Sequence, residues 1–188
     1  MTKVFFAELM KKIKACADCR EFLEPRPVVF GSQDAKIFQI SQAPSRKVHE
    51  TGWPFNDVSG DKLIFEWYRI TRQEFYDKFY ITSISHCYPG KANTGDNKPP
   101  IKCAEKWLHK EMKAVDNKIY LIIGKYAANY FFPGKNLGTL AFNTQKLNGK
   151  PAFVMPHPSP LNSKWLKDNP EFERDRLLTI RKAIHRVL

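Results

Sequence analysis

The sequence predicts an α/β fold of three layers, in which helices cover both faces of a short, mostly parallel central sheet of four strands. Short apolar runs rich in β-branched and aromatic residues alternate with segments of helical periodicity, an order typical of parallel sheets. The 188 residues are 43% hydrophobic, enough for one sizeable core, and no repeat or low-complexity tract interrupts them. We therefore expect one domain that spans residues 1–188.

The expected elements follow from these periodicities. Lysines interleaved through the apolar positions of residues 1–19 indicate an amphipathic first helix. Strands are expected at residues 36–41, 78–84, 118–124 and 151–156. Further helices are expected near residues 60–70, 100–115, 125–132 and 170–187. Residues 143–151 are expected to form a turn before the last strand, with Asn148 and Gly149 at its centre.

The chain is strongly basic. Its 31 Lys and Arg against 19 Asp and Glu give a net charge of +12. Such a charge attracts polyanions, and a nucleic-acid backbone is the simplest partner, although a merely basic protein stays open as an alternative. Neither a bilayer-spanning apolar run nor a signal peptide is seen, so we expect a cytoplasmic protein with no membrane partner.

The four cysteines are the strongest chemical signal. Cys16 and Cys19 form a C-x-x-C pair, and Cys87 and Cys103 follow much later. Disulfides are disfavoured in a basic protein of the cytoplasm. Four thiolates fit either a structural zinc ion or a [4Fe–4S] cluster, and the spacing does not separate the two. Four unrelated buried cysteines are the remaining alternative.

Loops at the carboxyl ends of parallel strands are expected to gather around one crevice. Here these are "SQAPS" at 41–45, "SHCYPG" at 85–90 and "PHPSPLN" at 156–162. In the last loop three prolines fix the backbone around His157 and bias it away from helix. We therefore expect His157 to project from a rigid, extended loop that presents side chains.

Three patterns together resemble the iron–sulfur uracil-DNA glycosylases. The cysteine spacing is similar to their ligand set, "SQAPS" followed by "TGWPFNDVSGDKL" looks like their first motif and the segment after it, and "HPSPLN" looks like their histidine loop. The likeness runs from Cys16 to Asn162 and is closest to families four and five of the uracil-DNA glycosylase superfamily. It implies a [4Fe–4S] cluster, with zinc as the alternative, on the ligands Cys16, Cys19, Cys87 and Cys103.

The resemblance also implies an activity. A monofunctional hydrolase of base excision repair would flip a deaminated base out of DNA and hydrolyse its N-glycosidic bond, leaving an abasic site. Uracil is the first candidate base, with hypoxanthine and xanthine as further ones. The implied partner is DNA containing damaged bases, and the protein is expected to be a monomer.

Two departures from family four concern the site. Gln42 and Ser83 stand where that family has a glutamate and an asparagine, whereas Asp61 matches an aspartate of family five, whose members tolerate more kinds of damaged base. Two alternatives therefore stay open. One is a catalytically weak or inactive DNA-binding member of the same fold, and the other is a zinc-stabilised α/β protein with an unrelated ligand.

Base excision needs an aromatic face for the flipped base, a carboxylate near the developing sugar cation and a donor to the departing base. The catalytic candidates are His157 as donor, Asp61 facing the cation, and Asn162, which would hydrogen-bond the base or a phosphate. Glu50 and Asp57 are rival carboxylates. Substrate-binding candidates lie in or beside the crevice loops: Gln42, Ala43, Phe55 as the stacking ring, Ser83, and Leu161 as a wedge into the duplex.

Overall fold

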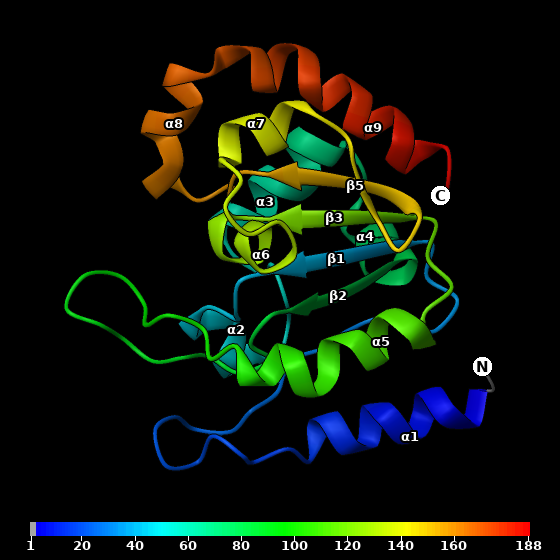
Figure 1. Cartoon of the computed structure of the whole chain (residues 1–188), viewed down its shortest axis with the longest axis vertical. Coiled ribbons are helices and arrows are strands. Elements are labelled where there is room, and N and C mark those ends of the chain that lie inside the picture. Colours follow the sequence, from blue (N-terminus) through cyan, green and yellow to red (C-terminus); the bar gives the residue numbers. More distant parts are fainter. Residues whose placement is uncertain (1–2) are drawn as a thin grey trace.

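Five strands form one sheet in the order β2-β1-β3-β5-β4, in a computed structural model that describes residues 3–188 (Figure 1). All neighbouring strands run parallel except β4, which is antiparallel to β5. The strands are β1 (Ile37–Ser41), β2 (Phe79–Ser83), β3 (Ile119–Ile123), β4 (Gln145–Leu147) and β5 (Lys150–Met155).

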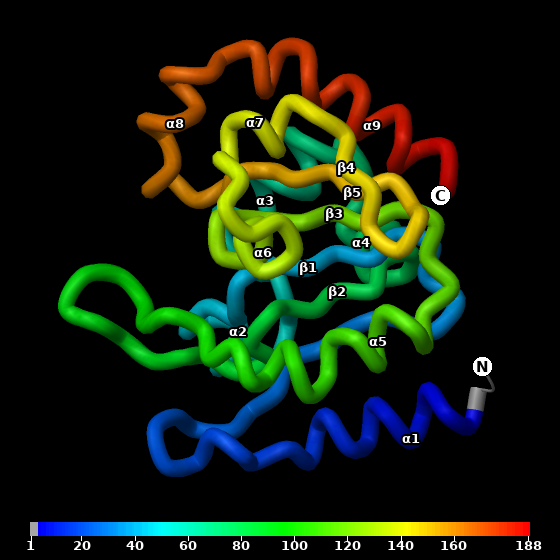
Figure 2. The backbone as a smooth tube through the Cα atoms, in the orientation of Figure 1, coloured from blue at the N-terminus to red at the C-terminus, as the bar shows by residue number. Residues whose placement is uncertain are grey.

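Helices cover both faces of this sheet (Figures 1 and 2). One layer contains α1 (Lys3–Lys14), the π-helical turn η2 (Ala104–Leu108) with α5 (His109–Ala114), and α6 (Lys125–Phe131). The other contains α3 (Val58–Asp61) with the π-helical turn η1 (Lys62–Tyr68), α4 (Arg72–Lys78), and η4 (Phe172–Arg176) with α9 (Leu177–His185). The remaining helical segments are α2 (Arg46–Thr51), α7 (Leu137–Phe142), the 3-10 turn η3 (Pro160–Asn162) and α8 (Ser163–Asp168).

A hydrophobic core lies on each face of the sheet, and successive residues of each strand point alternately into the two cores. Phe38 and Ile40 of β1 point into the core beneath α1 and α5, whereas Ile37 points into the core beneath η1 and α9. Every residue of β1, β2 and β3 is buried. Burial on both faces explains why these strands appear in the sequence as continuous apolar runs.

The predicted fold class is confirmed, but the predicted number of strands was wrong by one. Asn148 and Gly149 do form the tight turn, each with a positive φ. The three residues before it are the short edge strand β4, which pairs with β5. Leu147 is their one apolar residue and none of the three is fully buried, so they lack the apolar signal of a strand.

Short capped helices were missed for a related reason. Thr71 and Glu74 form a reciprocal capping box at the start of α4, and Ser45 caps α2 by accepting a hydrogen bond from the Val48 amide. With six or seven residues each, these helices offer too little periodicity to be recognised from the sequence. No helix within residues 3–188 is long and apolar enough to cross a bilayer.

The outer edge of β2 is covered by the segment that precedes β1. Phe30 exchanges two backbone hydrogen bonds with Ile81, and the Val28 amide donates to the His86 carbonyl over 2.7 Å. Gly31 follows with a φ of +109°, and a Cβ there would lie 2.3 Å from the Phe79 carbonyl oxygen. Only glycine fits this position, because the obstacle is backbone.

We expect Gly31→Ala to destabilise the protein by about 2–4 kcal/mol, since it adds a backbone clash to an unfavourable φ. Urea unfolding measures this change. Gly134→Ala is the matched control, because Gly134 also has a positive φ but nothing lies within 4 Å of the added Cβ. The control should cost only about 1 kcal/mol. Equal losses for the two variants would contradict the proposed contact with β2.

Candidate active site

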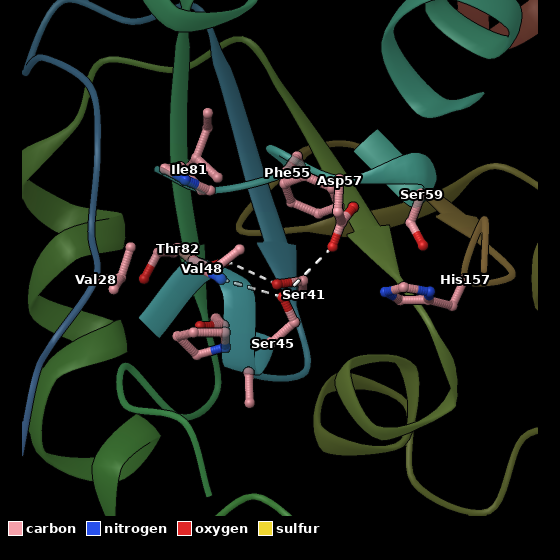
Figure 3. Close-up of a pocket in the computed structure, with 14 residues that line it drawn as sticks. Val28, Ser41, Ser45, Val48, Phe55, Asp57, Ser59, Ile81, Thr82 and His157 are labelled. Atoms are coloured by element: carbon pink, nitrogen blue, oxygen red, sulfur yellow. Dashed lines mark hydrogen bonds between the residues drawn. The ribbon is translucent and has the colours of Figure 1, made fainter. Parts of the chain in front are cut away.

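A pocket opens at the carboxyl edge of the sheet, where loops from several strands meet (Figure 3). It is built from the ends of β1 and β2, the loop before α2, the segment before α3 and the proline loop. Its lining residues are Val28, Ser41, Ala43, Pro44, Ser45, Val48, Pro54, Phe55, Asp57, Ser59, Ile81, Thr82, Ser83 and His157. Segments far apart in the chain therefore meet here, as the strand-end argument predicted.

His157 is held in one orientation by its own loop. The Ser159 amide donates to Nδ1 over 3.2 Å, so the proton of the neutral ring lies on Nε2. The Asn162 side chain donates to the His157 carbonyl over 3.0 Å. Burial lowers the pKa of His157, and the nearby Asp57 carboxylate opposes this only in part. The site therefore contains a neutral imidazole with a fixed N–H donor.

Asp57 is the carboxylate that lines this pocket, together with His157 (Figure 3). One of its oxygens accepts from the Gly60 amide over 2.9 Å and caps α3, and the other accepts from the Ser45 hydroxyl over 3.4 Å. These two donors fix the side chain. Asp57 was named above as a rival carboxylate, and an Asp directly before the start of a helix is an N-cap signal that favours it.

Asp61, the carboxylate predicted to face the sugar, does not line the pocket. Its side chain is 55% exposed and pairs with Arg72. It borders a separate groove against Pro158 and Pro160 of the proline loop. The geometry thus brings Asp57 to His157 and leaves Asp61 outside, because Asp61 lies one helical turn further along α3.

Phe55 forms one wall of the pocket in a strained conformation. Its φ of +56° lies in the left-handed region, which is unfavourable for a bulky residue. Arg72 donates to its carbonyl over 3.2 Å, and its ring packs edge-on against Phe75. Gly60 lies so close that a Cβ there would overlap the Phe55 carbonyl oxygen. These neighbours hold the strained backbone in place.

The other predicted substrate residues divide into two groups. Ala43 and Ser83 line the pocket, whereas the side chain of Gln42 does not. The carbonyl of Gln42 instead accepts from the Ser85 amide over 3.1 Å and joins two strand-end loops. Leu161 is 89% exposed at the tip of the proline loop, outside the pocket. The side chain of Asn162 binds within the proline loop, through its hydrogen bond to the His157 carbonyl.

The loop of residues 85–90 was expected to face the same crevice, and this prediction was wrong. Ser83, the last residue of β2, lines the pocket, but none of residues 85–90 does, and Ser85, His86 and Cys87 line a second cavity instead. That cavity is also lined by the other three cysteines: Cys16, Cys19 and Cys103. All four thiols are free. Thus one strand end serves two neighbouring cavities.

The chemistry of the cysteine cavity suits a bound cation. Burial raises the pKa of Cys87 to about 12, and burial also raises the pKa of Cys19. Thiolates gathered here therefore need positive charge to be stable. Within residues 3–188, however, no three Cys, His, Asp or Glu side chains are grouped closely enough to hold a single metal ion.

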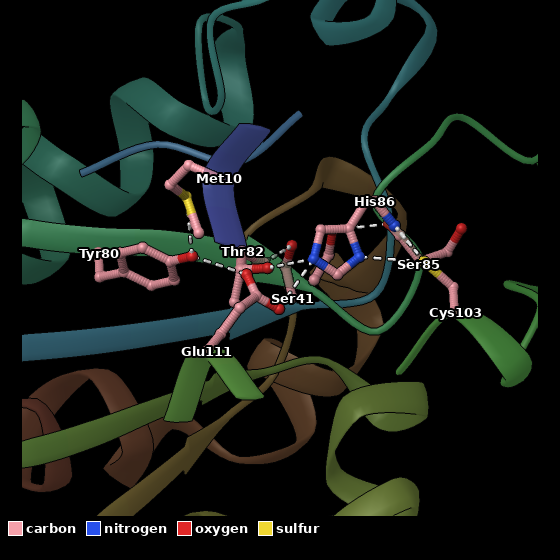
Figure 4. A network of polar contacts seen from close by, with 9 residues as sticks. Met10, Ser41, Tyr80, Thr82, Ser85, His86, Cys103 and Glu111 are labelled. Carbon is pink, nitrogen blue, oxygen red and sulfur yellow. Dashed lines mark hydrogen bonds and ion pairs between the residues drawn. The ribbon is translucent and has the colours of Figure 1, made fainter. Parts of the chain in front are cut away.

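A buried polar network lies behind this cavity (Figure 4). His86 Nδ1 lies 3.0 Å from the Cys103 sulfur, and His86 Nε2 lies 2.9 Å from a carboxylate oxygen of Glu111. Tyr80 donates to the other oxygen over 2.8 Å. Burial alone would lower the pKa of His86, but Glu111 and the Cys103 sulfur raise it to about 10. His86 and Glu111 therefore form a fully buried ion pair.

A pocket with a fixed imidazole, a capped aspartate and an aromatic wall lies at the carboxyl edge of a parallel sheet, the usual place of the functional site in α/β proteins, and the chain around it is strongly basic. Residues 28–181 match the model of the Uracil DNA glycosylase superfamily, so the chain belongs to that superfamily. Its members are DNA glycosylases, hydrolases that act on DNA in base excision repair. The family predicted from the motifs is confirmed. The match begins after Cys16 and Cys19 and therefore does not bear on the iron–sulfur type.

We expect Glu111→Gln to destabilise the protein by about 3 kcal/mol, because it leaves the buried His86 without its counter-charge. Chemical unfolding measures the change. Glu105→Gln is the control, since Glu105 is exposed on the preceding turn and its replacement should change stability by less than about 0.5 kcal/mol. A Glu111→Gln protein as stable as the control would show that the ion pair adds nothing.

Proposed function

We propose that this protein removes deaminated bases from DNA by hydrolysing their N-glycosidic bond, leaving an abasic site. The observation that carries the proposal is the joint presence of His157 and Asp57 in one pocket at the strand ends. As the N-glycosidic bond breaks, negative charge develops on the departing base and positive charge on the sugar. The N–H of His157 can stabilise the negative charge, and the Asp57 carboxylate can stabilise the positive charge.

In the proposed reaction the base leaves the duplex and enters the pocket against Phe55. The Nε2–H of His157 donates to a base oxygen as negative charge develops there. Asp57 faces the sugar, stabilises its cation and orients the attacking water. Because the Ser159 amide and the Gly60 amide already fix both side chains, little ordering is needed when the charges form.

The lining of the pocket supports a broad choice of base. Its polar side chains include five hydroxyl groups, from Ser41, Ser45, Ser59, Thr82 and Ser83. The hydroxyls of Ser41, Ser45 and Ser83 already donate within the protein, so they offer a base acceptor oxygens, whereas a carboxamide would impose one fixed donor and acceptor pattern. Among the described residues that line the pocket there is no Asn or Gln. This favours tolerance of hypoxanthine and xanthine in addition to uracil.

An oligonucleotide panel tests the proposal. Strands containing uracil, hypoxanthine or xanthine are incubated with excess enzyme, and abasic product is detected by alkaline cleavage. We expect product from at least one of the three and none from an undamaged strand. Tight binding of every oligonucleotide without product would contradict the activity and favour the DNA-binding alternative.

We expect His157→Ala and Asp57→Asn each to slow single-turnover cleavage by roughly 100-fold or more, because each removes one preorganised charge-stabilising group. Asp61→Asn is the matched control and should cleave at nearly the unmodified rate, since Asp61 lies outside the pocket. The control also decides whether Asp57 or Asp61 is the carboxylate that faces the sugar. A large loss in Asp61→Asn, with Asp57→Asn active, would restore Asp61 as the carboxylate.

We further propose that Cys16, Cys19, Cys87 and Cys103 hold a [4Fe–4S] cluster. Support comes from four free thiols that line one cavity although they come from segments far apart in the sequence. In a four-iron cluster each thiolate binds a different iron, so the sulfurs lie farther apart than around zinc. When bound, the cluster supplies a structural cross-link from the chain after α1 to the start of η2.

We expect protein purified without oxygen to be brown and to contain about four iron and four sulfide per chain. Cys103→Ser should lose the colour and unfold at lower denaturant concentration, because metal binding contributes to folding. Residual folded protein should keep its cleavage rate, since the cluster lies outside the proposed reaction. Colourless protein with one tightly bound zinc would contradict the cluster.

A further inference from the structure

We propose that Trp53 provides a stacking platform for an unpaired nucleobase next to the base held in the pocket. The platform consists of three aromatic side chains: Phe30, Trp53 and Tyr76. The inference rests on the proposed function, because it takes the pocket as the place of the damaged base. It adds a second recognition element to that site and predicts a preference for unpaired strands.

The three rings hold one another in place. The ring centroids lie 5.3 Å apart for Phe30 and Trp53, and 5.1 Å apart both for Phe30 and Tyr76 and for Trp53 and Tyr76. The Trp53 amide donates to the Thr51 hydroxyl at the end of α2. Trp53 is nevertheless 47% exposed, whereas Trp67 and Trp107 are buried. Part of a firmly positioned indole therefore remains open to solvent.

The platform adjoins two walls of the pocket. Trp53 is followed directly by Pro54 and Phe55, which line the pocket, and the Tyr76 hydroxyl donates to the Pro54 carbonyl over 2.9 Å. On the other side, Phe30 exchanges backbone hydrogen bonds with the pocket residue Ile81. A strand whose target base enters the pocket thus leaves a neighbouring nucleotide within reach of the indole.

A nucleobase is the occupant that fits this surface best. The net charge of +12 attracts a polyanionic strand, and an indole stacks on any base regardless of sequence. In a duplex, the base next to the flipped nucleotide exposes only the face toward the vacated gap, and pairing keeps that base inside the helix. An indole on the protein surface outside the helix is therefore reached most readily by an unpaired neighbour, as in single-stranded DNA or in a locally opened duplex.

Equilibrium binding tests the proposal on the full-length protein. The probe is a fluorescein-labelled single strand containing 2′-fluoro-2′-deoxyuridine, whose glycosidic bond resists hydrolysis, so that binding is measured without turnover. A second probe is identical except that both nucleotides next to the uridine lack bases. The variants are Trp53→Ala, Trp53→Phe, which keeps an aromatic face, and the control Phe5→Ala, whose exposed ring lies on α1.

We expect Trp53→Ala to weaken binding of the first probe by roughly 5- to 100-fold, the range for losing one base–aromatic stack. On the second probe the same variant should bind like the unmodified protein. Trp53→Phe should recover most of the affinity, and Phe5→Ala should lose none. Unchanged binding in Trp53→Ala, or an equal loss on both probes, would overturn the platform.

The test separates the platform from the proposed activity. Cleavage of damaged strands with no base-dependent effect of Trp53→Ala would leave the activity standing and refute the platform. Suppose instead that no damaged strand is cleaved, and that Trp53→Ala loses affinity only for the probe that keeps its neighbouring bases. This result would refute the activity and leave the platform standing. Urea unfolding of Trp53→Ala verifies that a loss of affinity does not come from loss of fold.

Discussion

Four parallel strands end at the same edge of the sheet, and everything functional in this protein depends on that constraint. Parallel strands must return by crossovers, so the loops that leave their carboxyl ends converge although they are far apart in the chain. Ser41, Ala43, Ser83 and His157 meet in one pocket for this reason. The arrowheads of β1, β2, β3 and β5 in Figure 1 point to this shared edge.

The end of β2 connects two sites that perform different tasks. Thr82 lines the pocket, and its hydroxyl lies 3.2 Å from His86 Nε2, while the other ring nitrogen of His86 lies against the Cys103 sulfur. A chain of three side chains thus runs from the pocket wall to the cysteine cavity. The two sites therefore share one structural support at the end of β2, and neither His157 nor Asp57 is part of it.

The sequence predicted the layers, the parallel strands and two of the three pocket loops because these features depend on local periodicity and on residues such as proline. It named Asp61 as the carboxylate facing the sugar, whereas the carboxylate that lines the pocket is Asp57, four residues earlier. Asp57 and Asp61 are both plausible in a one-dimensional pattern, and only the turn of α3, capped by Asp57, decides which one points into the pocket. The strand β4 and the platform around Trp53 were likewise invisible, because they depend on contacts between distant segments.

The glycine that covers the edge of β2 also fixes the register of the segment beside it. Successive residues of an extended segment face opposite sides. A shift of this segment by one residue along β2 would therefore turn Val28 and Phe30 away from their present side and put Val29 there instead. The pocket would lose one wall and the aromatic cluster one ring in the same movement. Gly31 prevents this slip, because no side chain can take its place above the Phe79 carbonyl. A residue with no side chain thus keeps two recognition surfaces aligned with each other.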